Sequence, residues 1–204
     1  SQADTAFVSF GDSFDDVFAE TDGKFSFSFW VKYADLSQTK LNLICKSSHA
    51  QCASDQRQFI IRRGDNQKLE FHVYGSLNWS PIYWVEGSTV INDTEWHHFV
   101  ITYDGSVDSN GGLDRVQLYV DNNAETETIS YSDGNLGNIA DGNAHLGFGA
   151  PLTPTGEYCE TAGQMYSMQG LMDDFRIYDK VLTPQEVDSL FNEPSPCTVG
   201  LEDQ

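Results

Sequence analysis

The chain has few basic residues. It carries 11 Lys and Arg against 31 Asp and Glu, a formal net charge of −20 over 204 residues. A field of that sign repels nucleic acid and anionic membranes, so we expect neither as a partner. It suits calcium ions and a saline exterior, although most of these carboxylates serve solubility.

Long hydrophobic runs are also missing. No stretch of about 18 apolar residues occurs, so we expect no membrane insertion, and no signal-like segment opens the chain. We expect residues 1–193 to form one domain and residues 194–204 to be a C-terminal tail or the start of a linker. The chain therefore reads as one module of a larger multidomain, extracellular protein.

Helical patterns are scarce, whereas aromatic residues are abundant. Thirteen Phe, nine Tyr and four Trp supply a large aromatic core. Residues 24–33, KFSFSFWVKY, alternate between apolar and polar positions, as a strand with one packed face does. About ten short strands at similar spacing predict an all-β fold, an antiparallel two-sheet sandwich of the jelly-roll type.

A single helix is predicted near the C-terminus. Thr183 and Glu186 have the spacing of a capping box, and Pro184 occupies the first helical position. A narrow apolar stripe follows, made of Val187, Leu190 and Phe191. We expect one short C-terminal helix that lies as a lid on the sheets.

The four cysteines indicate an oxidising compartment with two disulfides. Three connectivities are possible, and the favoured one pairs Cys45 with Cys52 and Cys159 with Cys197. The second bridge would staple the C-terminal tail to the body. Zinc held by Cys45, His49 and Cys52 is an alternative, but a fourth ligand is not evident.

Three stretches in fixed order carry a family resemblance. They are FSFSFWVK at residues 25–32, EWHHFVITYDG with RVQLYVDN between residues 95 and 122, and MQGLMDDFRIYDKVLTPQEVDSLF at residues 168–191. Together they resemble the laminin G-like members of the concanavalin A-like lectin and glucanase superfamily. The resemblance implies a jelly roll, often with a structural calcium near the final strand. It leaves the function open, because this fold carries lectins, adhesion modules and enzymes.

Calcium would need several oxygen ligands from loops. Asp173 is the best candidate, because an unpaired carboxylate inside a strand is costly. The resemblance places the segment 11–23 near the last strand, so Asp12 or Asp22 could reach the same ion. The alternative for Asp173 is hydrogen bonding to backbone amides or pairing with Arg176, and Asp174 is expected to face water.

A sugar site is predicted in the aromatic segment 75–88, which is poorly periodic, contains Pro81, and reads as a loop or an edge strand. Aromatic rings flanked by polar groups are typical of sugar recognition. The alternative is that these rings close one end of the core. The candidate residues are Trp79, Tyr83 and Trp84, flanked by Asn78 and Glu86.

A rare basic pair, Arg62 and Arg63, stands out in this acidic chain. It could receive a uronate or a sulfate. Pairing with local carboxylates is the simpler expectation.

Catalytic patterns are absent. No strand carries three alternating acids as in the glucanases of this superfamily, and no Gly-x-Ser-x-Gly elbow occurs. Glu125 and Glu127 alternate, but only two acids occur, in what reads as an exposed hairpin. The sequence therefore predicts a non-catalytic, calcium-stabilised carbohydrate-binding module with a polysaccharide or glycan as partner. A protein adhesion module without a sugar site is the first alternative, and a glycosidase or polysaccharide lyase the second.

Overall fold

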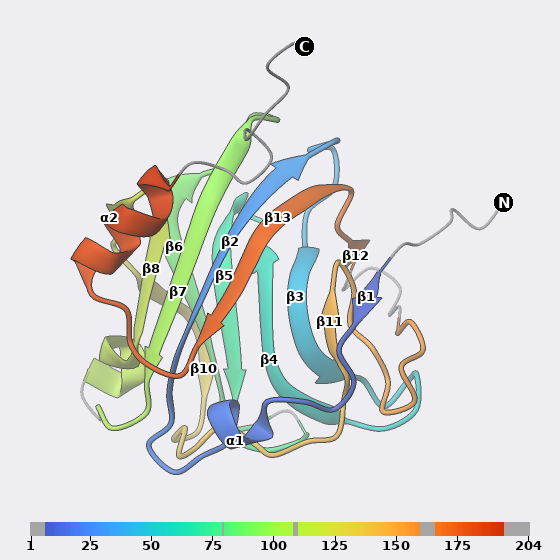
Figure 1. Cartoon of the computed structure of the whole chain (residues 1–204). Coiled ribbons are helices and arrows are strands. Elements are labelled where there is room, and N and C mark those ends of the chain that lie inside the picture. Colours follow the sequence, from blue (N-terminus) through green and yellow to red (C-terminus); the bar gives the residue numbers. More distant parts are fainter. Residues whose placement is uncertain (1–6, 79, 108–109, 160–165, 194–204) are drawn as a thin grey trace, which may run out of the picture.

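The computed structural model describes residues 7–78, 80–107, 110–159 and 166–193. Two antiparallel sheets pack face to face, as the sequence predicts (Figure 1). No helix within these described residues is long and apolar enough to cross a bilayer.

The larger sheet has eight strands in the order β1-β11-β3-β4-β5-β6-β10, with β12 parallel to β3. Its strands are β1 (Val8–Ser9), β3 (Leu41–Ser48), β4 (Gln56–Arg63), β5 (Lys68–Tyr74), β6 (Ile82–Val90), β10 (Thr128–Asp133), β11 (Leu146–Phe148) and β12 (Tyr166–Ser167).

The smaller sheet has five strands in the order β13-β2-β7-β8-β9. These are β2 (Lys24–Tyr33), β7 (Trp96–Asp104), β8 (Val116–Val120), β9 (Asn123–Ala124) and β13 (Gly170–Tyr178). The alternation of β2 is confirmed, because Phe25, Phe27, Phe29 and Val31 are each 0% exposed and face the larger sheet.

The C-terminal helix is confirmed as α2 (Pro184–Asn192), and its capping box between Thr183 and Glu186 is complete. The helix lies on the outer face of the smaller sheet (Figure 1). Val187 and Leu190 pack there with residues of β7 and β8, and Phe191 stacks on Trp30 at a centroid distance of 5.5 Å. The helix is therefore a structural lid.

Two further helical turns were not predicted. A one-turn helix α1 (Asp15–Phe18) lies inside the acidic segment 11–23, and the 3-10 helix η1 (Asn110–Arg115) follows the β7 turn. The buried side chain of Phe18 holds helix α1 against the core. Phe18 is 1% exposed, and its ring lies 5.0 Å from that of Phe59. Helix patterns need several turns to be readable in a sequence, so one turn held by a single buried ring is missed.

The aromatic segment 75–88 also differs from the prediction. Residues 82–90 form the interior strand β6, paired with β5 on one side and β10 on the other. Pro81 directly precedes the strand, where its missing N–H breaks no ladder hydrogen bond.

The expected hairpin forms, because β9 pairs antiparallel with β8, but Glu125 is not exposed on it. Glu125 is 6% exposed, and its carboxylate accepts hydrogen bonds from the amides of Ser88 and Thr89, each at 2.6 Å. This acid therefore joins the two sheets at one end.

Candidate functional site

A transverse row of side chains crosses the outer face of the larger sheet. The pairing register places Cys45 opposite Ile60, Ile60 opposite His72, His72 opposite Trp84, and Trp84 opposite Tyr131. The alternate residues of the same strands, such as Phe59, Phe71 and Val85, point into the core between the sheets. The outer face thus collects polar and aromatic groups from five neighbouring strands.

A depression of about 270 Å³ lies beside this row, and we call it the outer-face cavity. Its lining residues come from β3 to β6 and the adjoining loops: Lys40, Ser47, His49, Arg57, Ile60, Arg62, Asp65, His72, Tyr74 and Trp84.

Trp84 is held in place on one wall of the cavity. Its ring stacks on the His72 imidazole at 4.5 Å with planes 10° apart, and the Arg62 guanidinium lies 5.6 Å from its centre. Tyr131, which is 38% exposed, packs against it at 4.8 Å. These contacts fix the indole before any ligand arrives, which lowers the entropic cost of binding.

A buried charge cluster supports this wall. One oxygen of Glu70 accepts hydrogen bonds from Arg62 Nε at 2.7 Å and from His72 Nε2 at 2.8 Å. Burial alone would raise the pKa of Glu70, but these hydrogen bonds and the Arg62 charge lower it. Gly64 leaves the necessary room, since a Cβ there would lie 1.7 Å from Glu70 Oε1. Glu70 is therefore a fixed anion that orients Arg62.

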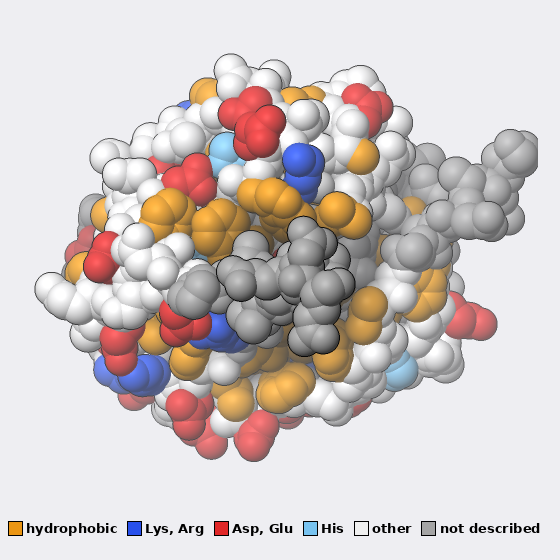
Figure 2. Space-filling view, turned by 45° about the horizontal axis from the view of Figure 1, so that its top comes forward, with side chains coloured by type: hydrophobic (Ala, Val, Ile, Leu, Met, Phe, Trp, Pro, Cys, Tyr) orange, Lys and Arg blue, Asp and Glu red, His pale blue; other side chains and the backbone are white. Residues whose placement is uncertain are grey.

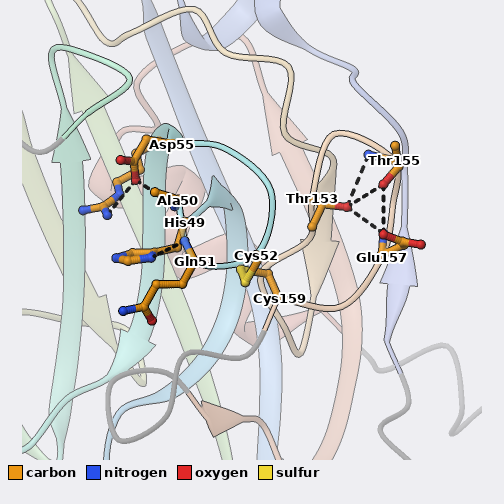
Figure 3. Close-up of a disulfide and its surroundings, with 10 residues drawn as sticks. His49, Ala50, Gln51, Cys52, Asp55, Thr153, Thr155, Glu157 and Cys159 are labelled. Carbon is orange, nitrogen blue, oxygen red and sulfur yellow. Dashed lines mark hydrogen bonds and ion pairs between the residues drawn. A yellow bond between two sulfur atoms is a disulfide. The ribbon is translucent and has the colours of Figure 1, made fainter.

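The opposite wall depends on the loop between β3 and β4. Asp55 accepts a hydrogen bond from Arg57 at 2.8 Å and from the amide of Ala50 at 3.1 Å. The same loop carries Cys52, which is bonded to Cys159 in the loop after β11 (Figure 3). The disulfide thus restrains the loop that positions Arg57.

The predicted disulfides are wrong. Cys52 pairs with Cys159 across a Cα separation of 5.5 Å, and Cys45 is a free, buried thiol. Cys45 lies in the middle of β3 and packs with Ile60 and Tyr74, so it cannot turn toward the loop that follows the strand. Cys197 lies outside the described residues, and Cys159 is already bonded to Cys52.

Two buried histidines should make the domain labile to mild acid. Burial lowers the pKa of His72 and of His98 to about 4, against about 6.5 in an unfolded chain. Below pH 6.5 the unfolded chain binds more protons, so the free energy of unfolding falls as the pH drops from 6.5 toward 4. Urea unfolding at pH 7.5, 6 and 5 measures this, before most carboxylates titrate.

A His98→Gln variant tests whether His98 contributes to the loss of stability in mild acid. His98 is 1% exposed and its Nε2 lies 2.9 Å from Ser28 Oγ, a contact that glutamine can imitate. The variant should lose stability at pH 7.5 yet show a shallower decline toward pH 5. An unchanged slope in this variant would contradict the assignment.

The predicted sugar-binding residues are dispersed. Trp84 lines the outer-face cavity, but its neighbour Tyr83 is 6% exposed and belongs to the core, because adjacent strand residues face opposite sides. Glu86 is buried, and its carboxylate accepts hydrogen bonds from Lys68 at 3.0 Å and from an asparagine side chain. Asn78 is exposed in the connection before β6, and Trp79 lies outside the described residues.

The structure does not gather the predicted calcium ligands. Among the described residues, no group of three or more His, Cys, Asp or Glu is placed to hold a metal. Asp12 Oδ1 lies 2.5 Å from the Lys46 ammonium, and Asp22 lies in the turn before β2. Calcium binding through Asp173, with Asp12 or Asp22, therefore stays a prediction.

The adjacent aspartates of β13 are accommodated by a bulge. The register against β2 shifts between Asp173 and Arg176, and Asp174 adopts a left-handed φ of 49°. Asp173 accepts a hydrogen bond from the Asp174 amide at 2.8 Å, one of the predicted alternatives. Arg176 instead holds Asp174 through two hydrogen bonds of 2.9 Å, so Asp174 does not simply face water.

A second hollow of about 760 Å³ lies at the open edge between β1, β11 and β13. It is mainly apolar, with Phe148 against Phe175 at 4.1 Å and Leu171 61% exposed. Figure 2 shows that hydrophobic side chains gather near the middle of one face of the molecule, with acidic side chains mostly toward its margins.

Sequence reasoning missed Arg57, His72 and Tyr131 as cavity or wall residues. Each lies on a different strand, so their approach depends on strand order and register. Arg62 was noted as half of a basic pair, but Arg63 faces the other way, where it is 1% exposed and donates to the carbonyl of Ile91. Alternation within β4 could have separated the two arginines in advance.

Comparisons with known proteins agree with this architecture. A family model described as the concanavalin A-like lectin/glucanases superfamily matches residues 4–188. Domain 4 of AbnA, a GH43 extracellular arabinanase from Geobacillus stearothermophilus in complex with arabinotriose, has a TM-score of 0.52 at 18% identity, covering 85% of this chain and 68% of that one. A search of curated proteins finds no match.

Two further solved structures are similar. The CBM40 of a Ruminococcus gnavus IT-sialidase bound to α2,3-sialyllactose has a TM-score of 0.55 at 9% identity, covering 83% of each chain. Botulinum neurotoxin type C, whose cell entry depends on interaction with two ganglioside molecules, has a TM-score of 0.63 at 16% identity, covering 94% of this chain and 40% of that one. At such identities the likeness shows the fold.

Proposed function

Because the chain belongs to the concanavalin A-like lectin/glucanase superfamily, we propose that it is a non-catalytic carbohydrate-binding module of an extracellular protein. Its sugar site is the outer-face cavity. The observation that carries the proposal is the immobilised Trp84 ring beside a small cavity lined by polar side chains.

The chemistry of the cavity suits a sugar. A pyranose presents C–H groups on its faces and hydroxyls around its rim, so it needs aromatic surface together with hydrogen-bonding groups. Trp84, against which Tyr131 packs, supplies the aromatic surface, whereas Arg57 and Arg62 supply donors in fixed positions. The similar structures solved with arabinotriose and sialyllactose support the proposal.

The same geometry favours binding over hydrolysis. Glycoside hydrolysis requires two carboxyl groups across the scissile bond, one of them with a raised pKa. Asp65 is the single carboxylate among the described residues that line the cavity, and it pairs with Lys40 at 3.2 Å. Glu70 lies outside the lining, and its pKa is lowered.

Location and calcium are separate parts of the proposal. The disulfide fits an extracellular, oxidising location. Calcium stabilisation stays a prediction, and a protein adhesion module without a sugar site stays the alternative.

A Trp84→Ala variant tests the site. A glycan array with neutral and acidic oligosaccharides first identifies a ligand for the wild-type domain, and calorimetry then gives its dissociation constant. We expect the variant to bind at least about tenfold more weakly, because central aromatic anchors dominate such interfaces.

Trp96→Ala is the matched control. Trp96 is also partly exposed, at 38%, but it lies at the start of β7 in the other sheet. The Trp96→Ala variant should bind glycan with the same affinity as the wild type. Equal affinity of the Trp84 variant and the wild type would reject the site, and a wild-type domain that binds no glycan would reject the function.

A further inference from the structure

Several of the few cations of this acidic protein line the outer-face cavity. Only 11 of its 204 residues are Lys or Arg, and the net charge is −20. Three of them, Lys40, Arg57 and Arg62, line this one depression, where Asp65 is the only described carboxylate in the lining. The lining therefore has more cationic than anionic side chains, unlike the protein as a whole.

Both arginines of the cavity lining form ion pairs with carboxylates that lie outside the lining. Arg62 is paired with Glu70 and Arg57 with Asp55, yet neither carboxylate is part of the cavity lining. Glu70 accepts from Nε of Arg62 and so holds its guanidinium toward the cavity, whereas Asp55 accepts from the terminal Nη2 of Arg57. Both arginines are largely buried, at 8% and 6% exposure, so little side-chain entropy is left to lose on binding.

An additional polar group of the lining lacks a partner. Ser47 is 1% exposed, and its hydroxyl has no hydrogen-bond partner among the described residues. Ser47 lies opposite Arg57 in the β3–β4 ladder and lines the same cavity. A buried hydroxyl without a partner is costly, and a ligand oxygen placed there would remove that cost.

We propose that the outer-face cavity recognises an anionic substituent on a sugar, a carboxylate or a sulfate ester, and this rests on the proposed function. The planar guanidinium groups of Arg57 and Arg62 match the oxygen geometry of such anions. Lys40, which is paired with Asp65 at 3.2 Å, lies beside them in the lining. Ser47 binds a further oxygen, and the sugar ring lies against Trp84.

Matched pairs of oligosaccharides test the inference by calorimetry on the whole domain. The first pair is trigalacturonate and its methyl ester, which differ in charge but not in skeleton. The second pair is lactose 3′-sulfate and lactose. At least one acidic member should bind about tenfold or more tightly than its neutral partner, and the pair that discriminates identifies carboxylate or sulfate. That preference should shrink between 50 and 500 mM NaCl.

Arginine variants locate the effect. Arg57→Gln and Arg62→Gln should abolish the preference for the acidic member, and Arg62→Lys should restore only part of it, because an ammonium lacks the planar fork. Lys40→Gln keeps the test usable if a buried arginine variant fails to fold, since the Lys40 side chain is 28% exposed. Lys24→Gln, which removes an exposed pair with Asp104, is the control and should bind like the wild type.

The outcomes separate the two proposals. Equal affinity for acidic and neutral members, in a domain that binds glycans through Trp84, would overturn the acidic specificity and leave the proposed function intact. Absence of binding to any glycan of the array would overturn both. An acidic preference that survives Arg57→Gln, Arg62→Gln and Lys40→Gln would also overturn the assignment to this cavity.

Discussion

Replacing Lys46 with methionine is expected to destabilise the domain by about 3 kcal/mol. The Lys46 side chain is 0% exposed, and its ammonium lies 2.5 Å from Asp12 and 3.2 Å from Asp15. It also donates to the carbonyl of Ala144 at 2.9 Å. Without it, two carboxylates face each other with no cation. This expected loss of stability is at the lower end of the range for breaking buried ion pairs, because Asp12 and Asp15 keep contact with water.

Urea unfolding at pH 7 measures this loss as a lower midpoint at an unchanged slope. Lys24→Met is the matched control, because its pair with Asp104 has a similar length of 2.9 Å but is exposed. Its effect should stay below about 1 kcal/mol. Adding Asp15→Asn to Lys46→Met should recover part of the loss, since it removes the repulsion. Equal effects of the two lysine variants would contradict a structural role for the buried ammonium.

Removal of the Cys52–Cys159 disulfide is also expected to lower the stability of the domain strongly. Cys52 and Cys159 are 107 residues apart in the chain, so the bridge restricts a long loop of the unfolded state. In the chain-entropy picture the double variant Cys52→Ala, Cys159→Ala should lose about 4 to 5 kcal/mol of stability. Denaturant unfolding with and without a reducing agent measures the loss, and reduction should affect only the wild type.

Cys45→Ala provides the comparison. Burial raises the pKa of the Cys45 thiol, so in the native domain it should not react with thiol reagents. Its removal should cost less than loss of the bridge, because no cross-link is lost. A peptide map that joined Cys45 to Cys52 would refute the pairing, and a double variant as stable as the wild type would refute its contribution.

Local rules explain what could be predicted from the sequence alone. Strand β2 follows from alternation, since every second residue of KFSFSFWVKY must face the core. Helix α2 follows from Thr183, Pro184 and Glu186, whose capping interactions join residues within one turn. The two-sheet architecture follows from many such strands with few helices. These features depend on neighbours within a few positions, which a sequence displays directly.

The tertiary structure decided everything that depends on residues far apart in the chain. Strand order and register bring Arg62, His72 and Trp84 together, place Lys46 between Asp12 and Asp15, and make Cys159 the partner of Cys52. Even Tyr83 and Trp84, adjacent in the sequence, separate into core and cavity once β6 is an interior strand. The physical reason is that composition and periodicity determine which residues are buried, whereas the pairing of distant strands determines which of them meet.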